Sequence, residues 1–575
     1  MRKNKLRKCM LMMGIGITVF ALGACNKASE NDNTVMEIDS TIAVDTVDGA
    51  GTATNTQVED GIVNIDLSDD GINVNGIVAS GDTSDSVYVA NDIIYYETDK
   101  DFTYGEGTEA DAHDSVEASS HTVVHITKPG TYNVSGKLSR GQIAIDLGED
   151  AKDNPDAIVS LILDGADITC DVAPAVIFYN VYECGSDDAD SATKDVDTKS
   201  AGANVIIADD TTNTINGSYV AKIYKPDSVV LSEDETEVLD ASKLHKYDGA
   251  LYSRMSMNID GGKNGNGVLN INAENEGLDS ELHLTINGGN INISSGNDGI
   301  NTNEDGVSVT TINGGSLNIL VNGKTGEGDG IDSNGWLVIN GGKVTAQACS
   351  DSADAGIDSD MGIHITGGTV IATGHMLDRI EDGGQTYAVF NFNGKQAMVE
   401  TIYLKDESNS VVMETCPENA YSVMIYSSPE LVSGTYTLWS DDTKLSNQAG
   451  SAMGGPGMQG MNPDGMEAPD GMDKPEGMEP SEGMEKPEGM TPPEGMEKPE
   501  GMTPPEGMEM PEGMEPPQGM ERPEGVEPPM DGERTDKPGD ETGDFVNPDN
   551  QVNEAQERIY EFQINEGANM FGGIS

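Results

Sequence analysis

The sequence has few basic residues. Its 32 Lys and Arg stand against 101 Asp and Glu, which gives a formal net charge of −69 over 575 residues. Proteins that bind nucleic acids need a basic surface, so this class of function is excluded. A charge of this sign is compatible with partners that are neutral, cationic or joined to the protein through bound cations.

Long apolar segments and long helical patterns are missing as well. The apolar run at residues 10–22 is too short to span a bilayer comfortably. Before the last ~30 residues, no stretch shows the apolar spacing of a long amphipathic helix. The sequence therefore argues against a helical membrane protein and against a helical bundle.

The N-terminus has the pattern of an export signal. Basic residues precede the apolar run, which closes with "LGAC" at 22–25. This ending looks like a bacterial lipobox, and the resemblance implies cleavage before Cys25 and lipid attachment to its sulfur. We expect a lipoprotein signal peptide at 1–24, a flexible tether at 25–59, and a protein anchored by lipid to the extracellular face of the bacterial cell membrane. The alternative is an ordinary signal peptide that is cleaved without lipidation.

Cysteine is scarce, with six residues in the whole chain. Cys9 lies in the signal and Cys25 is the expected lipidation residue. The other four lack CxxC spacing, which excludes a zinc or redox motif of that type and favours burial as small apolar residues. Cys170 and Cys184 could also form a disulfide.

Short alternating apolar runs fill residues 60–445. Glycine, asparagine and aspartate punctuate them, which is typical of strands joined by tight turns. Examples are "IVNIDL" (62–67), "SVYVA" (86–90), "TVVHI" (122–126), "AIVSLIL" (157–163) and "NVIIA" (204–208). This pattern predicts an all-β domain.

A period appears between about residues 258 and 370. A Gly pair follows residues 260, 287, 313, 340 and 366, so the steps are 27, 26, 27 and 26 residues. Alternating segments precede and follow each pair. Steps of this size, made of short strands and Gly/Asn turns, predict a solenoid in which the strands of successive coils stack in parallel, that is, a parallel β-helix. Tandem hairpins would not keep the same turn at the same phase.

Residues 463–528 form a different repeat, with hexads such as "PEGMEK" and "PEGMTP". Proline and glycine in nearly every unit exclude a persistent helix or ladder, so we expect a disordered insertion at 446–557. The methionines could ligate copper(I), but a mobile spacer is the simpler interpretation. Alternation returns in the last residues, and we expect 558–575 to pack back near 421–439, because loop closure costs little extra for a longer loop.

Four related motifs place acidic and amide side chains beside one Gly-apolar pair: "EGLDSE" (276–281), "DGINTN" (298–303), "GDGIDSN" (328–334) and "AGIDSD" (355–360). Strand alternation turns the apolar member inward and the next residue outward. The inward residues are Leu278, Ile300, Ile331 and Ile357. The outward residues are Asp279, Asn301, Asp332 and Asp358.

Neighbouring coils lie about 4.8 Å apart. Two carboxylates at that distance repel by roughly 1 kcal/mol in water and more at the lower dielectric of a protein surface. Such a ladder is either solvated or neutralised by a cation, and calcium favours mixed carboxylate, amide and backbone oxygens. Histidine and cysteine are missing from the columns, which argues against softer metals. The expected ligands are Asp279, Asp298, Asp329, Asp332, Asp358 and Asp360.

Several stretches resemble a family of bacterial secreted carbohydrate-binding proteins with a right-handed parallel β-helix related to pectate lyases. They are the "INGG…DGID" coils, "LSDDGINVNG" (67–76), "HITKPGTYNVSGKLSRGQIAIDL" (125–147), "VSLILDGADIT" (159–169), "DGALYSRMSMNIDG" (248–261) and the terminal strands. The resemblance implies calcium sites on the helix and binding of plant cell-wall polysaccharides such as cellulose and polygalacturonate, without established catalysis. Insertions at 77–120 and 182–200 depart from the family pattern.

These observations favour a non-catalytic surface protein that binds polysaccharide. A flat, regular face suits a linear glycan, and calcium would bridge an anionic glycan to a negative protein. Trp336 could stack on a sugar ring or cover the edge of the core, and Asn303 and Asn334 could bind hydroxyl groups. Two alternatives remain open: an adhesive or structural surface protein without glycan specificity, and a calcium-dependent lyase, for which the sequence shows no evident base. The oligomeric state is not predictable.

Overall fold

The computed structural model describes residues 61–185, 187–448 and 558–575. The predicted signal peptide (1–24), Cys25, the tether (25–59) and all but the first residues of the predicted insertion (446–557) lie outside the described residues. Within the described ranges, no helix is long and apolar enough to cross a membrane. Helices there are limited to α2 (Ser115–Ser119) and the 3-10 turns η2 (Glu149–Asp153) and η3 (Pro226–Ser228), so the fold is nearly all β.

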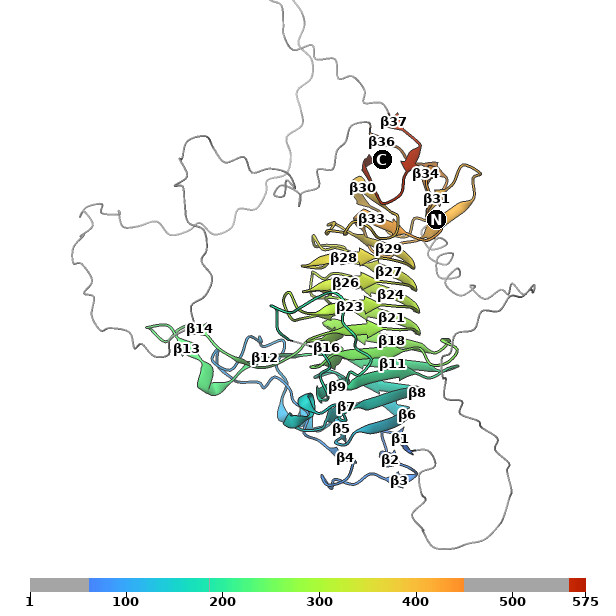
Figure 1. The fold of residues 1–575 in the computed structure, drawn as a ribbon. Helices are drawn as coiled ribbons and strands as arrows, with labels where there is room; N and C mark the ends of the chain where they lie inside the picture. Colours follow the sequence, from blue (N-terminus) through green and yellow to red (C-terminus); the bar gives the residue numbers. More distant parts are fainter. Residues whose placement is uncertain (1–60, 186, 449–557) are drawn as a thin grey trace, which may run out of the picture. The chain divides into compact units, whose positions relative to one another are not determined.

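The repeating part of the chain is built from coils that each contribute three strands (Figure 1). One coil contains β19 (Glu276–Ser280), β20 (Leu284–Ile286) and β21 (Asn290–Ser295). The next contains β22 (Ile300–Thr302), β23 (Val309–Ile312) and β24 (Ser316–Val321). A third contains β25 (Ile331–Ser333), β26 (Trp336–Ile339) and β27 (Lys343–Gln347). Equivalent strands of these coils pair in parallel, as the sequence period predicts.

The strands belong to two main sheets. The first has eight strands in the order β25-β22-β19-β16-β9-β7-β5-β4. Its remaining members are β16 (Gly249–Ser253), β9 (Val176–Asn180), β7 (Gly141–Asp146), β5 (Thr122–Ile126) and β4 (Val87–Ala90). All its pairings are parallel except β4 with β5 at the edge. The acidic motifs lie at the β19–β25 end of this sheet.

The second sheet has twenty strands and supplies the other two rows of the coils. One row continues β20, β23 and β26 with β10 (Ala203–Ile207), β17 (Met257–Asp260) and β28 (Gly362–Ile365). The other continues β21, β24 and β27 with β11 (Thr212–Gly217), β18 (Val268–Ala273) and β29 (Thr369–Gly374). The long strands β6 (Gly130–Leu138) and β8 (Val159–Thr169) also belong to it, and β8 pairs with both β10 and β11.

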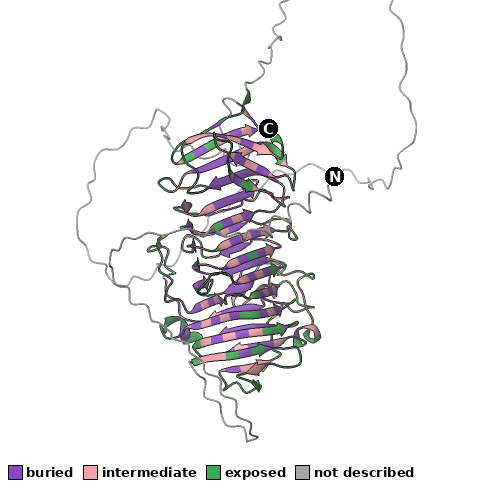
Figure 2. Cartoon of the chain, turned by 90° about the vertical axis from the view of Figure 1, so that its right-hand side faces the viewer, coloured by how far each residue is buried: buried purple, intermediate pink, exposed green. Residues whose placement is uncertain are grey.

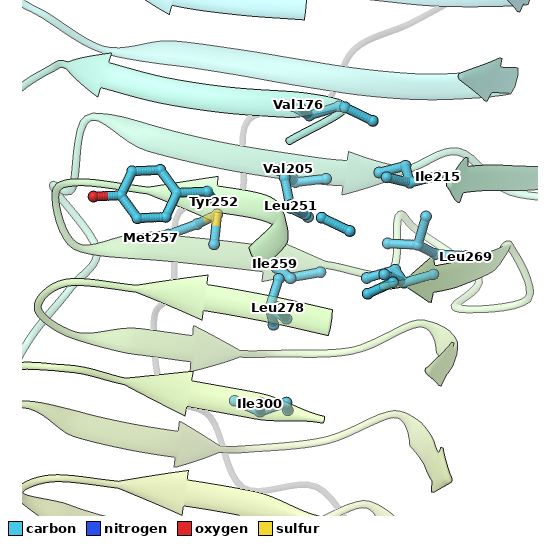
Figure 3. Close-up of a cluster of buried hydrophobic side chains, with 14 of the residues drawn as sticks. Val176, Val205, Ile215, Leu251, Tyr252, Met257, Ile259, Leu269, Leu278 and Ile300 are labelled. Carbon is cyan, nitrogen blue, oxygen red and sulfur yellow. The ribbon is translucent and has the colours of Figure 1, made fainter. Parts of the chain in front are cut away.

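The core lies inside the coils and is made by the inward residue of each strand. Leu278, Ile300 and Ile331 are stacked in register and completely buried, and Ile357 in the following turn is buried as well. Figure 3 shows Leu251, Leu278 and Ile300 in line, with side chains from the other sheet across from them. Burial of this apolar column drives the stacking, because each branched side chain loses its contact with water between its neighbours.

The glycines that precede this column have a steric role. A Cβ on Gly299 would overlap the methyl Cγ2 of Ile319 and would lie 2.5 Å from the carbonyl oxygen of Gly330 in the next coil. Gly277 and Gly330 face the same kind of backbone contact with the coil that follows each of them. The Gly-apolar pair is therefore the sequence requirement for coils that approach this closely.

Antiparallel strands close both ends of the stack. At one end β1 (Ile62–Leu67) pairs with β2 (Asn73–Val74), which pairs with β3 (Ile77–Val78). At the other end β33 (Tyr421–Ser427) lies between β29 and β30 (Tyr387–Gln396), and β39 (Ala568–Ile574) pairs with β30. β38 (Phe562–Ile564) pairs with β34 (Gly434–Ser440), so strands from both sides of the undescribed segment lie together. Pairing of this kind covers the ends of the twenty-stranded sheet, whereas β25 is the last strand of the eight-stranded sheet.

The remaining described strands are short and lie outside the coils. β31 (Ile402–Lys405), β32 (Val411–Thr415) and β35 (Thr443–Lys444) join β34 in a small sheet, and β36 (Asn447–Gln448) pairs with β37 (Arg558–Ile559). An insertion between β11 and β16 forms two hairpins, β12 (Val220–Tyr224) with β15 (Lys243–Tyr247) and β13 (Val230–Leu231) with β14 (Val238–Asp240). This insertion lies before the repeats of the sequence, so their period does not mark it.

The two cysteines considered for a disulfide are both free thiols in the structure. Cys170 is 1% exposed at the end of β8 and belongs to the main apolar core, where it packs as a small apolar residue. Cys184 is only partly buried and lies next to Glu183, whose carboxylate binds Ser256. A disulfide between Cys170 and Cys184 is therefore not formed.

Candidate functional site

Three of the four acidic motifs lie on adjacent strands of the eight-stranded sheet, and the fourth follows in the next coil. Asp279, Asn301 and Asp332 are Cα partners on β19, β22 and β25. The turn that follows continues the stack, because the backbone N–H of Asp358 donates to the carbonyl of Ile331 at 2.7 Å. We call this set, together with the acidic residues that flank it on the same coils, the acidic column. Its flanking members are Glu276, Glu281, Asp298, Asp329, Asp360 and the coil-end residue Asp378.

The acidic column is buried at its β19–β22 end, which the sequence does not reveal. Asp279 is 0% exposed, Glu276 6%, Asn301 7% and Asp298 9%. Of the two states considered for the ladder, a fully solvated one does not describe this part of the column. Asp279 lies in register between Tyr252 and Asn301, and its neighbours on the adjoining coils shield it from water.

Some carboxylate oxygens in the column are bound by neighbouring coils. Asn301 Nδ2 donates to Glu276 Oε1 at 3.0 Å, and Asn303 Nδ2 donates to Asp279 Oδ1 at 2.6 Å. The backbone N–H of Asp329 donates to Asp298 Oδ1 at 2.7 Å. Each of these hydrogen bonds spans one coil step, so the carboxylates are held in place by the coil that follows.

Four other oxygens of the column are buried without a partner. They are Glu276 Oε2, Asp279 Oδ2, Asn301 Oδ1 and Asp358 Oδ1. A buried polar atom without a partner costs free energy, and an unpaired carboxylate costs more than a neutral group. Three of the four belong to adjacent strands, β19 and β22, and all four are oxygens. The arrangement offers acceptors and lacks a donor.

Cationic side chains reach the ends of the column. At the β16 end, Lys222 Nζ lies 4.0 Å from Asp248 and Lys246 Nζ lies 3.9 Å from Glu281; both lysines come from the β12–β15 hairpin. At the far end, the positive charge of Arg379 acts on Asp378. Between these ends six acids form no ion pair with any residue of the described ranges. They are Glu276, Asp279, Asp298, Asp329, Asp332 and Asp358.

The unpaired acids have raised pKa values. Burial raises the pKa of Asp298, Asp332 and Asp358 to about 7 and that of Asp329 to about 9, and the negative charges of nearby carboxylates add to the rise. For Glu276 and Asp279, burial followed by the charges of neighbouring acids places the pKa well above its usual value. The column therefore holds either protons or another cation more readily than exposed acids do.

The donor set fits a hard divalent cation in chemistry but does not form a ready-made cage. In the described part of the chain, no group of three or more His, Cys, Asp and Glu side chains is placed to hold a metal. The unpartnered atoms at β19 and β22 instead combine two carboxylates with one amide oxygen. Calcium accepts such mixed oxygen ligands and completes its shell with water or backbone carbonyls. The residues present fit calcium better than they fit a soft metal.

The predicted carbohydrate residues occupy different environments. The side-chain amide of Asn303 donates a hydrogen bond to Asp279. The side-chain amide of Asn334 donates to the carbonyl of Asn303 at 3.1 Å and to Asp305 at 3.2 Å. Both therefore position groups of the protein. Trp336 begins β26 in the other sheet, half-buried between Val309 and Gly362 in the ladder. Asp360 is exposed at the rim of the column.

Sequence reasoning missed three residues of this site. The alignment of the motifs puts Glu276 at the same flanking position as Asp298 and Asp329, but Glu276 is absent from the expected ligands. Asn301 was placed in the column but not among the ligands, although its Oδ1 is one of the unpartnered atoms. Asp378 follows the last coil and accepts a hydrogen bond of 3.1 Å from the N–H of Ser359; no repeat marks it.

Comparisons with known proteins find similarity over part of the chain. Residues 120–399 match the model of a family described as carbohydrate-binding domain-containing protein. A carbohydrate-binding domain-containing protein of Acetivibrio thermocellus is 29% identical over 177 residues, which is 31% of this chain and 46% of that protein, so the chain spans about half the length of this relative. A solved structure of the polysaccharide lyase-like protein from C. thermocellum, a gadolinium derivative, covers 54% of this chain and 89% of that one at 19% identity, with a TM-score of 0.30.

Proposed function

We propose that this protein is a cell-surface lipoprotein that binds cell-wall polysaccharide through a calcium-associated face of a right-handed parallel β-helix, without catalysis. The glycan class is cellulose or a pectin-type chain. Two findings support the binding of carbohydrate in general: the family match over residues 120–399 and the relative in Acetivibrio thermocellus. The anchor at Cys25 rests on the lipobox motif alone.

The proposal that this face binds calcium is supported mainly by the buried oxygens that have no hydrogen-bond partner. Glu276 Oε2, Asp279 Oδ2 and Asn301 Oδ1 lie on adjacent coils in a region that no described lysine or arginine neutralises. In this proposal these three residues hold the ion, and Asp298 and Asp332 add negative charge nearby. A bound calcium ion supplies positive charge to a face that would otherwise repel an anionic glycan.

The chain's own residues prepare this site. Asn303 holds one oxygen of Asp279 and leaves the other free, and Asn301 does the same for Glu276. The lysines of the β12–β15 hairpin neutralise Asp248 and Glu281 and thereby limit the unpaired charge to the middle of the column. Inward stacking of Leu278 and Ile300 fixes the spacing of the acids.

A calcium-dependent lyase is the second candidate, because Lys246 and Lys222 lie beside the acids and a lyase needs a base near its metal. Both lysines are engaged with carboxylates, which favours a neutralising role. A surface adhesin without glycan specificity is the third candidate. Incubation with polygalacturonate and calcium separates the lyase, since elimination creates an unsaturated uronate that absorbs in the ultraviolet.

Polysaccharide pull-down with and without EDTA tests the proposal. The full chain is mixed with insoluble cellulose or with immobilised polygalacturonate, and the bound fraction is measured in calcium and in EDTA. We expect retention on polygalacturonate that depends on calcium. Retention on neither glycan in either condition would leave the adhesin interpretation and refute the proposed function.

A further inference from the structure

A second face of the coils differs from the acidic column in charge. The outward residues of β18, β21, β24 and β27 include no aspartate or glutamate, although the chain holds 101 acidic residues. We call this surface the amide face. Its central ladder runs through Asn270, Asn292, Asn318 and Thr345, which are Cα partners on successive strands. Lys343 is the one charged outward residue of these four described strands.

The amide face is accessible to solvent. Asn292 is exposed, and Asn270, Asn318 and Thr345 are half-buried, while the intervening residues on each strand are buried in the core. Figure 2 shows stacked strands on this side of the coils, along which buried positions alternate with intermediate or exposed ones. The face ends at Gln347, whose Oε1 accepts a hydrogen bond of 2.7 Å from the N–H of Glu418.

The asparagines of the ladder are joined in one direction. Asn292 Nδ2 donates to Asn270 Oδ1 at 3.0 Å, and Asn318 Nδ2 donates to Asn292 Oδ1 at 3.1 Å. A primary amide has two N–H groups and an oxygen with two lone pairs. Each ladder amide therefore keeps hydrogen-bonding capacity for a ligand, and the repeat distance along the ladder is about 4.8 Å.

We propose that the amide face is the docking surface for a neutral, extended polysaccharide chain and that this docking does not require calcium. The inference rests on the proposed function and assigns a second surface to it. A sugar hydroxyl both donates and accepts hydrogen bonds, which matches a row of groups that do the same. A face without carboxylates meets such a chain without desolvating charge.

Charge also selects this occupant over the alternatives. A polyuronate is repelled by a chain of net charge −69 wherever no cation bridges the two. A second copy of the same protein carries the same charge and is repelled in the same way. A neutral glycan meets neither obstacle. The two faces then divide the ligands: anionic chains at the acidic column with calcium, neutral chains at the amide face without it.

Two variants test the amide face. Thr345→Glu and Ser316→Glu each place a carboxylate on it. Neither the Thr345 nor the Ser316 side chain takes part in the hydrogen bonds between the ladder asparagines. The matched control is Thr415→Glu on β32, also half-buried but outside the coils. The full chain and each variant are bound to microcrystalline cellulose and to polygalacturonate, in EDTA and in calcium, and each is checked for wild-type thermal unfolding.

The expected result is that the wild-type chain binds cellulose in EDTA and that Thr345→Glu or Ser316→Glu weakens this binding about tenfold, while Thr415→Glu does not. Binding by Thr345→Glu and Ser316→Glu equal to that of the control would overturn the inference and leave the proposed function intact. A wild-type chain that binds polygalacturonate but not cellulose would likewise overturn the inference and leave the proposed function intact. A dimer that Thr345→Glu dissociates would make this face an interface between copies and also overturn it. A wild-type chain that binds neither glycan would refute the proposed function itself.

Discussion

Asp279 and Asn303 are joined by a hydrogen bond of 2.6 Å from Asn303 Nδ2 to Asp279 Oδ1, while the other carboxylate oxygen of Asp279 is buried and has no partner. The coil that follows thus fixes the side chain in an orientation that leaves one oxygen free. Glu276 and Asn301 repeat this arrangement on the same two coils, and the four residues together define the centre of the proposed calcium site.

Removal of the charge of Asp279 should abolish part of the response to calcium. A ligand that binds only the native state raises the unfolding free energy, by about 2.7 kcal/mol at 100 times its Kd. We expect Asp279→Asn to reduce the calcium-induced rise in Tm by more than half and not to lower Tm in EDTA, because the variant no longer buries an unpaired carboxylate. Differential scanning calorimetry measures both quantities. Asp382→Asn, at an exposed position, is the control and should respond to calcium like the wild type. An unchanged calcium response in Asp279→Asn would contradict the assignment.

The stability of the calcium-free protein should fall as pH rises from about 6.5 to 9. Asp298, Asp332 and Asp358 have folded pKa values raised to about 7, and Asp329 to about 9, above the unfolded value of about 3.9. Between the unfolded and the folded values the folded state holds protons that the unfolded state has lost, so their stabilising effect declines over this range and is gone once pH has passed the folded values. His245, whose pKa burial lowers to about 4, acts in the opposite direction but only below about pH 6.5.

The measurement is a Tm series in EDTA across this pH range, repeated with calcium. We expect calcium to remove most of the decline, because a bound cation takes the place of the protons. A Tm that rises with pH in EDTA between 7 and 9, where the carboxylates lose their protons, would contradict the raised pKa values.

The coil spacing should depend on Gly299. Gly299→Ala adds a methyl group that overlaps Ile319 and approaches the carbonyl of Gly330, and overpacking of this kind typically costs about 1–3 kcal/mol. Gly394→Ala is the matched control, since nothing lies within 4 Å of the added carbon there. Urea unfolding followed by circular dichroism compares the two. Equal midpoints for Gly299→Ala and Gly394→Ala would show that the coils can separate without cost.

The stacking of the coils could be predicted from the sequence because it depends on local rules. The steps of 26 and 27 residues and the Gly-apolar pairs specify which residues face each other, and the pairing of Leu278 with Ile300 and of Ile300 with Ile331 agrees. The ladder before the Gly pairs agrees too, with Asn313 donating to Asn287 at 2.9 Å and Asn340 donating to Asn313 at 3.0 Å. Period and steric constraint act within one coil step, so a single sequence reveals them.

The environment of the site could not be predicted in the same way. Burial of Asp279 depends on Tyr252 in the preceding coil, and the neutralising lysines Lys222 and Lys246 come from a hairpin inserted outside the repeat. These are contacts between segments whose spacing no periodicity constrains. The roles expected for Trp336 and Asn334 as glycan ligands stay predictions. The side-chain amide of Asn334 donates its hydrogen bonds to other residues of the protein.

Equilibrium dialysis of calcium against the full chain and against the double variant Glu276→Gln/Asp279→Asn is the most direct test of the cation site. Acidic groups elsewhere on the chain remain in both proteins, so the difference in bound calcium reports on the column alone. We expect the wild-type chain to hold at least one more ion than the variant, with a Kd of about 10⁻⁴–10⁻³ M, the range of extracellular calcium modules. Identical calcium binding by the two proteins would show that the unpartnered oxygens of Glu276 and Asp279 do not bind the ion.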